Sequence, residues 1–145
     1  MRFIQLPEAI PTGFPLLCLD KRHRGAFPRV LSIEDPEEET RHEPVIVCRQ
    51  CRKHITDESR RLSVDGANRH TFANPHGFVF EIACFGSAVG CLRAGSLSDE
   101  FTWFKGYSWQ AVICADCMTH LGWFFISSGG HHFFGLIVDR LASSF

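Results

Sequence analysis

Four of the seven cysteines form two C-x-x-C pairs, CRQC at Cys48 and Cys51 and CADC at Cys114 and Cys117. Two residues between cysteines allow a tight turn to point both sulfurs at one centre, and two such turns supply the ligands of a tetrahedral Zn²⁺ site. Four thiolates complete the coordination shell, so no position remains for a catalytic water. The spacing therefore predicts one structural zinc ion whose chelation melts the fold. Redox dithiols and neutral buried thiols are the alternatives.

A second concentration of chemistry is aromatic. The stretch EFTWFKGYSW, Glu100–Trp109, holds two of the three tryptophans and the single tyrosine, and Trp123 follows the second cysteine pair. A turn at Lys105–Gly106 is expected to bring Trp103 and Trp109 together. Rigid indole faces can form a cage that is open at one end, but aromatic residues of β domains are also common core residues. The residues alone leave both alternatives open.

Charge and hydropathy exclude several classes of protein. The net charge is −1; residues 1–44 carry 6 basic and 8 acidic groups, and residues 45–145 carry the remaining 9 and 8. Neither part has the basic excess of a nucleic-acid binder. No apolar stretch has the length of a membrane span, and prolines interrupt the N-terminal MRFIQLPEAIPTGFPLL before a signal-peptide core can form. We therefore expect no nucleic-acid or membrane partner and a cytoplasmic location.

The elements that must position these residues are predicted from a change in texture near residue 45. Residues 1–44 are rich in proline and acidic groups, which predicts a largely extended or disordered leader. Residues 45–145 contain short apolar stretches such as PVIVC, FVFEIACF, QAVIC and LGWFFIS, separated by turn residues such as NPHG. Strand-length runs of β-branched and aromatic residues predict an all-β, antiparallel domain, with one short helix in GLIVDRLASS, 135–144.

Taken together, these motifs resemble the CULT domain, the thalidomide-binding domain of the cereblon family, and in particular its single-domain bacterial members. The resemblance covers about residues 45–141 and is carried by CRQC, NPHGFVFE, EFTWFKGYSW, CADCMTHLGWFF and FFGLI in this order. It implies a β-tent, in which a four-cysteine zinc site joins two antiparallel sheets. It also implies a binding protein and no enzyme.

The resemblance further implies a three-tryptophan cage for cyclic imides: glutarimides such as thalidomide, uracil- or uridine-like rings, and C-terminal cyclic imides of damaged proteins. The implied ligand-binding residues are Asn74, Phe101, Trp103, Trp109, Trp123 and Phe125. In the family, backbone groups at the positions of Phe101 and Trp103 bind the imide edge. Animal cereblons carry histidine where this chain has Phe101, so one side-chain hydrogen bond is expected to be missing. Because 145 residues leave no room for the ligase-binding regions of cereblon, ubiquitin-ligase contacts are not expected.

Two other functions remain as alternatives. Methionine sulfoxide reductase B has a related zinc-bearing fold with a catalytic cysteine, for which Cys84 or Cys91 would have to serve; neither lies in an arginine-cysteine-asparagine signature. An aromatic-cage reader of methylated ammonium groups would also use three indoles.

Overall fold

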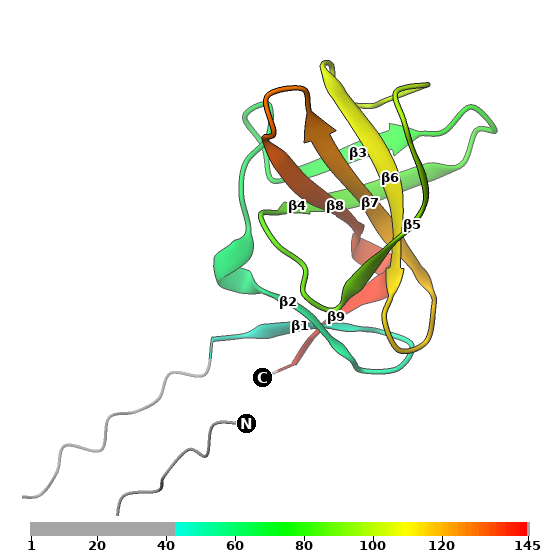
Figure 1. Ribbon diagram of the computed structural model, residues 1–145. Helices are drawn as coiled ribbons and strands as arrows, with labels where there is room; N and C mark the ends of the chain where they lie inside the picture. The colour runs from blue at the N-terminus through cyan, green and yellow to red at the C-terminus, as the bar shows by residue number, and fades with distance from the viewer. Residues whose placement is uncertain (1–42, 145) are drawn as a thin grey trace, which may run out of the picture. The chain divides into compact units, whose positions relative to one another are not determined.

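The computed structural model describes residues 43–144, which form two antiparallel sheets (Figure 1). The smaller sheet has the strand order β2-β1-β9, where the strands are β1 Val45–Cys48, β2 His54–Asp57 and β9 Leu141–Ser144. The larger has the order β3-β4-β8-β7-β6-β5, where the strands are β3 Arg69–Ala73, β4 Val79–Phe85, β5 Cys91–Ser98, β6 Tyr107–Cys114, β7 His120–Ser127 and β8 His132–Ile137. All pairings between these strands are antiparallel, which confirms the predicted all-β fold.

The central part of the larger sheet is buried on both faces. Strand β4 illustrates this, because Ala83 and Phe85 belong to one hydrophobic cluster while Ile82 and Cys84 belong to the other. Successive side chains of a strand point to opposite faces, so apolar residues at consecutive positions require two covered faces. This explains why FVFEIACF and LGWFFIS are apolar runs with only partial alternation.

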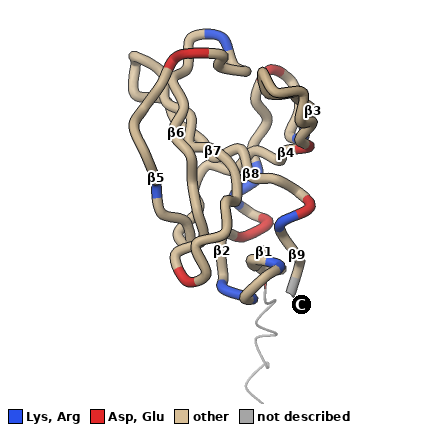
Figure 2. The backbone as a smooth tube through the Cα atoms, turned by 90° about the vertical axis from the view of Figure 1, so that its right-hand side faces the viewer, with Lys and Arg blue, Asp and Glu red and all other residues tan. Residues whose placement is uncertain are grey.

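The small sheet covers one of these faces. Its residues Ile46, Ile55 and Leu141 are buried in the same cluster as Phe85 and Val112 of the larger sheet. In both views the small sheet lies across one end of the larger one (Figures 1 and 2). The chain passes from β8 to β9 through a single 3-10 turn, η2 (Val138–Arg140).

The opposite face carries an aromatic layer that the loop between β5 and β6 closes. Phe104 from this loop is 1% exposed, and its ring lies edge-on to those of Phe125 and Phe133, at centroid distances of 4.9 and 5.0 Å. A β-turn, in which Tyr107 N–H donates to the Phe104 carbonyl, leads back into β6. Gly106 has a φ of 85° there, a conformation that glycine adopts without steric cost. The Lys105–Gly106 turn was therefore correctly predicted.

Other local expectations had mixed outcomes. The NPHG turn is present, since Gly77 N–H donates to the Asn74 carbonyl over 2.9 Å. The predicted helix at 135–144 is wrong, because this segment ends β8, forms η2 and becomes β9, whose residues pair with β1. Backbone pairing with a distant strand outweighed a weak local helix propensity. Within residues 43–144 no helix has the length and apolarity needed to cross a membrane. Residues 1–42 of the expected leader, including Cys18, lie outside the described residues.

Candidate functional site

The four predicted metal ligands converge. Their sulfur atoms all lie within 4.8 Å of one another, with 3.6 Å between Cys48 and Cys117 and 3.5 Å between Cys51 and Cys114. A tetrahedral ion with Zn–S bonds of about 2.3 Å places its sulfurs roughly 3.8 Å apart. The cluster therefore has the donor type, number and spacing to hold one four-coordinate metal ion.

The two cysteine turns repeat each other in backbone geometry. The residue after each pair, Arg52 or Met118, has a positive φ (66° and 62°) and donates its N–H to the carbonyl of the pair's first cysteine. The next residue, Lys53 or Thr119, accepts a 2.8 Å hydrogen bond from the N–H of that same first cysteine. Such turns hold both sulfurs of a pair on one side of the chain, as shared coordination requires.

The cysteine cluster bridges the two sheets. Cys48 ends β1 in the small sheet, and Cys114 ends β6 in the larger one. An ion pair of 3.4 Å between Lys53 and Asp116 adds a second, partly exposed link between the two turns. Hydrogen bonds from Thr119 lower the pKa of Cys117 to about 6, which favours the thiolate that a metal binds.

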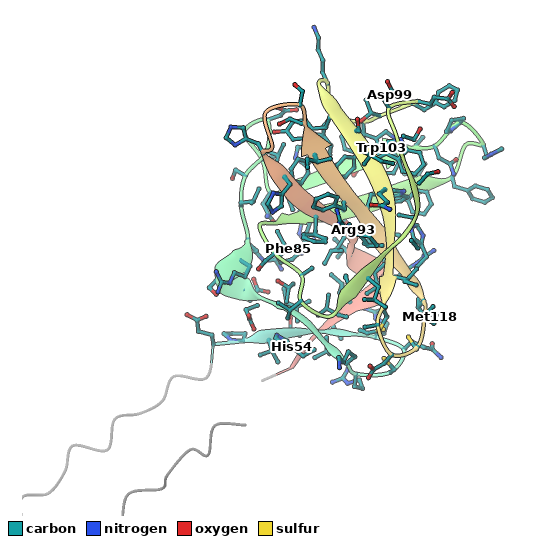
Figure 3. All side chains as sticks on the ribbon, in the orientation of Figure 1. His54, Phe85, Arg93, Asp99, Trp103 and Met118 are labelled. Carbon is teal, nitrogen blue, oxygen red and sulfur yellow. The ribbon has the colours of Figure 1, made fainter. Side chains whose placement is uncertain are left out.

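A cavity of about 440 Å³ lies apart from the cysteines, on the aromatic face of the larger sheet. Figure 3 shows Trp103 toward one end of the domain and Met118, beside the cysteine cluster, toward the other. Eight residues line the cavity: Asn74, Pro75, His76, Phe101, Trp103, Trp109, Trp123 and Phe125. All six residues that the resemblance implied are therefore brought together around one space, within the size range of small-molecule pockets.

Indole faces form the walls of this cavity. The rings of Trp103 and Trp123 meet at 72° with their centroids 4.6 Å apart, so they form a corner. Phe72 stacks on Trp103 at 5.0 Å, and Phe80 lies edge-on to Trp123 at 5.2 Å, which supports both walls. Packing against neighbouring rings fixes an indole in one orientation without filling the space between the walls.

The indole N–H groups are used differently from the ring faces. Trp103 Nε1 donates to the Ala73 carbonyl over 3.1 Å, and Trp109 Nε1 donates to the Glu100 carbonyl over 2.7 Å. Trp123 Nε1 has no hydrogen-bond partner among the described residues. Two of the three indoles are thus tied to the hairpin and loop that border the cavity, and the third indole N–H is not engaged by a described residue.

Unpaired backbone borders the cavity at Phe101–Trp103. None of the N–H or C=O groups of these three residues is hydrogen-bonded to another described residue. Phe101 has a φ of 52° and a side chain that is 74% exposed, an uncommon combination for a bulky residue. Residues in such conformations cluster at ligand sites. This backbone can supply donors and acceptors to a bound molecule.

Asn74 braces the β3–β4 hairpin on the other side of the cavity. Asn74 Oδ1 accepts hydrogen bonds from the backbone N–H groups of His76, over 3.0 Å, and Phe78, over 2.9 Å. The Asn74 oxygen therefore holds the β3–β4 turn, and only its amide nitrogen is left to face a ligand. Among residues 43–144, none that lines the cavity is lysine, arginine, aspartate or glutamate, although charges of both signs are interspersed along this part of the chain (Figure 2). The cavity is lined by uncharged and aromatic groups.

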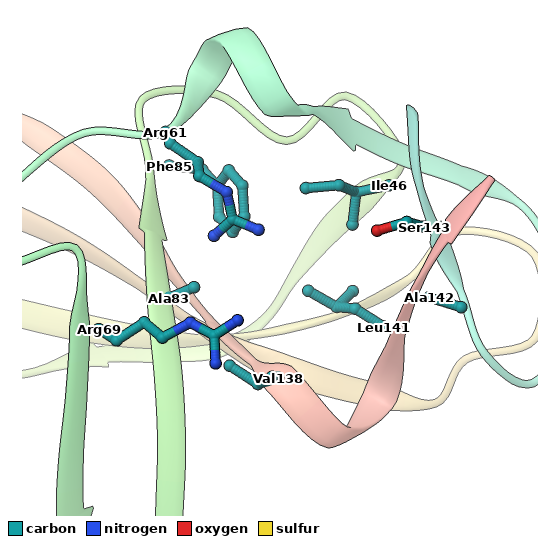
Figure 4. A pocket seen from close by; sticks show the side chains of 9 residues that line it. All are labelled: Ile46, Arg61, Arg69, Ala83, Phe85, Val138, Leu141, Ala142 and Ser143. Atoms are coloured by element: carbon teal, nitrogen blue, oxygen red, sulfur yellow. The ribbon is translucent and has the colours of Figure 1, made fainter. Parts of the chain in front are cut away.

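A second cavity, between the two sheets, is a poorer candidate (Figure 4). Its volume of about 90 Å³ is far smaller than the 440 Å³ of the indole-lined cavity. Two arginines point into it, but the Arg61 guanidinium is engaged by the Glu58 carboxylate and by Asn68. Arg69 donates to Glu81 over 3.1 Å. With each guanidinium paired to a carboxylate, this cavity has little capacity to attract an anion.

The two remaining described cysteines are not activated. Cys84 is fully buried and Cys91 is half-buried, and burial raises the pKa of each thiol to about 12. A thiol with such a pKa stays protonated near neutral pH, whereas a nucleophilic cysteine needs a lowered pKa.

Sequence reasoning missed several groups that shape the cavity. The carbonyls of Ala73 and Glu100 bind indole N–H groups, and Ser98 Oγ accepts a 3.1 Å hydrogen bond from Glu100 N–H. Carbonyls leave no signal in the sequence, and Ser98 stands in the stretch CLRAGSLS, which has no distinctive motif. Pro75 and His76 also line the cavity, and neither was among the predicted ligand-binding residues.

Comparison with known proteins gives one consistent set of relatives, although no family model matches the chain. Protein cereblon of Gallus gallus is 31% identical over 85 residues, which is 57% of this chain and 19% of that protein. Cereblon of Danio rerio is 34% identical over 83 residues, 55% of this chain and 19% of that protein. Cereblon of Drosophila mojavensis is 31% identical over 90 residues, 59% of this chain and 13% of that protein. The matched segment thus spans less than a fifth of each relative.

Proposed function

Because the chain contains a cereblon-like CULT domain, we propose that it is a binding module that captures cyclic imides in the cavity between Trp103, Trp109 and Trp123. The observation that carries the proposal is the pairing of apolar indole walls with the unpaired backbone of Phe101–Trp103. The ligand class comprises glutarimides, uracil-like rings and the C-terminal cyclic imides of damaged proteins.

The chemistry of the ring supports this assignment. A glutarimide has CH₂ groups on both faces and an edge with the order acceptor, donor, acceptor. Indole faces can enclose the apolar part, while the Phe101 carbonyl and the Trp103 N–H can pair with the edge. An imide edge that is buried without partners would cost about 1–3 kcal/mol per group, so the adjacent backbone is essential. For a small ring with few polar contacts we expect micromolar binding, about −6 to −8 kcal/mol.

We propose Zn²⁺ as the metal of the four-cysteine cluster. Thiolates in a tetrahedral set are the ligands that structural zinc sites use, and the cluster fits such a set. When bound, the ion would cross-link the two sheets and would take no part in ligand binding at the cavity. Binding without catalysis is also favoured by the raised pKa of Cys84 and Cys91, which argues against a sulfoxide reductase.

A reader of methylated ammonium groups is the second candidate, since three indoles also suit a cation. It is disfavoured because none of the described lining residues is aspartate or glutamate, so no carboxylate from this part of the chain offsets the ligand's charge. The neutral cyclic imide is the better match.

Calorimetric titration with glutarimide, uracil and trimethyl-lysine tests the proposal. We expect micromolar binding of glutarimide, weaker binding of trimethyl-lysine, and loss of glutarimide binding in Trp103→Ala. The control is Phe78→Ala, because Phe78 is an aromatic residue that is 65% exposed in the β3–β4 hairpin beside the cavity but is not among its lining residues. A preference for trimethyl-lysine, or glutarimide binding that survives Trp103→Ala, would sink the cyclic-imide assignment.

A further inference from the structure

Glu100 is held by both of its backbone groups. Its N–H donates to Ser98 Oγ over 3.1 Å, and its carbonyl accepts the 2.7 Å hydrogen bond from Trp109 Nε1. Ser98 and Trp109 are themselves partners across the β5–β6 pair. One residue pair at the end of two strands therefore fixes the residue that immediately precedes the unpaired backbone of the cavity.

The far side of the loop is anchored as well. Phe104 is buried in the aromatic layer, and Trp103 Nε1 is bound to the Ala73 carbonyl of the neighbouring hairpin. Between the two anchors only the Phe101–Trp103 segment lacks internal backbone hydrogen bonds. A short segment fixed at both ends has few accessible conformations, which lowers the entropy lost when a ligand pairs with it.

The conformation of Phe101 indicates that the anchoring is imposed by the surroundings. A φ of 52° is unfavourable for a bulky residue, and such a conformation persists only when neighbouring structure determines it. The nearest constraints are the two hydrogen bonds of Glu100. Release of either bond would allow Phe101 to return to negative φ, which would reorient the carbonyl of Phe101 and the N–H groups that follow it.

We propose that Ser98 and Trp109 are positioning residues of the cavity, which clamp Glu100 and thereby present the Phe101–Trp103 backbone to the ligand. Trp109 then has two roles: its ring face forms a wall, and its N–H sets the loop. The inference rests on the proposed cyclic-imide function, but the clamp itself is also a property of the free protein.

The test compares Ser98→Ala with the control Ser96→Ala. Ser96 lies two residues earlier in β5, is exposed, and its hydroxyl has no hydrogen bond among the described residues. We expect glutarimide affinity to fall about 3- to 10-fold in Ser98→Ala and to be unchanged in Ser96→Ala. Ser98→Thr keeps the acceptor oxygen and should restore affinity. The melting temperatures of the three variants should agree closely, since a hydrogen bond at an exposed loop contributes little to global stability.

Amide hydrogen exchange of the ligand-free protein provides the second readout. The Glu100 N–H should be protected in the parent protein and in Ser96→Ala, and should exchange faster in Ser98→Ala. Trp109→Phe keeps a ring but removes the N–H. The double variant Ser98→Ala/Trp109→Phe should lose less glutarimide affinity than the product of the two single losses, because either change releases Glu100. Unchanged affinity together with unchanged Glu100 exchange in Ser98→Ala would overturn the inference. If the parent protein binds no glutarimide, the proposed function fails, and the exchange data still decide whether the clamp exists.

Discussion

Loss of the metal is expected to cost a large part of the domain's stability. Cys48 of β1 and Cys114 of β6 are 66 positions apart, so an ion that both bind closes a long loop across the two sheets. A cross-link over a loop of that length restricts the unfolded chain by about 4 kcal/mol. A domain of this size has a total stability of roughly 5–15 kcal/mol, and each kcal/mol shifts its melting temperature by about 4–8 °C. Metal removal should therefore lower the melting temperature by about 15–30 °C.

The assay combines metal analysis with thermal unfolding followed by circular dichroism. The parent protein should contain one Zn²⁺ per chain and should melt at a lower temperature when a strong chelator is added. Cys48→Ser should lose the metal and show the same lowered transition without chelator. Cys84→Ala is the matched control, because Cys84 is equally buried but lies outside the cluster, so this variant should keep its metal. A metal-free Cys48→Ser protein that melts within about 5 °C of the parent would refute the cross-link reasoning.

Three further outcomes are expected. In Gly135→Ala the new Cβ would lie 2.8 Å from Ile82 Cδ1 and 3.0 Å from Phe125 Cε2. We expect the free energy of unfolding in urea to fall by about 1–3 kcal/mol, and glutarimide binding to weaken because Phe125 shifts into the cavity. Unchanged values for both would contradict this packing. Phe101→Gly removes the strain of a positive φ, so the melting temperature should stay the same or rise while glutarimide affinity falls. A clear drop in melting temperature would argue against strain at Phe101. Burial lowers the pKa of His120 below 6.5, so the unfolded chain binds a proton more readily than the folded one, and the free energy of unfolding should fall as the pH drops below about 6.5. In His120→Gln the free energy of unfolding in urea should depend less on pH in this range. An equally steep pH dependence in the variant would contradict this role of His120.

The metal ligands and the cavity lining were predictable for different reasons. The C-x-x-C turns are local, so two residues of spacing already determine that each pair of sulfurs points one way. The six cavity residues came from the resemblance to a known family, and the structure places all of them around one space. Strand β5 was not predicted, because it is an edge strand of its sheet, most of its residues are exposed, and small and polar residues interrupt its apolar ones. A strand whose formation depends on pairing with a neighbour leaves a weak pattern in its own sequence.

The sequence by itself determined the donor set for a metal, the all-β class, and the types of side chain available for a cavity, because these follow from composition and short-range spacing. Only the tertiary structure decided whether the tryptophans fill a core or line a cavity. Phe104 and Phe125 occupy the buried aromatic layer, which leaves the indoles at its outer side around open space. The backbone of Phe101–Trp103 has no hydrogen-bond partner among the described residues, and it directly follows Glu100, which Ser98 and Trp109 bind. The cavity also depends on contacts between segments that are distant in the sequence, such as the hydrogen bond from Trp103 Nε1 to the Ala73 carbonyl, which no local pattern encodes.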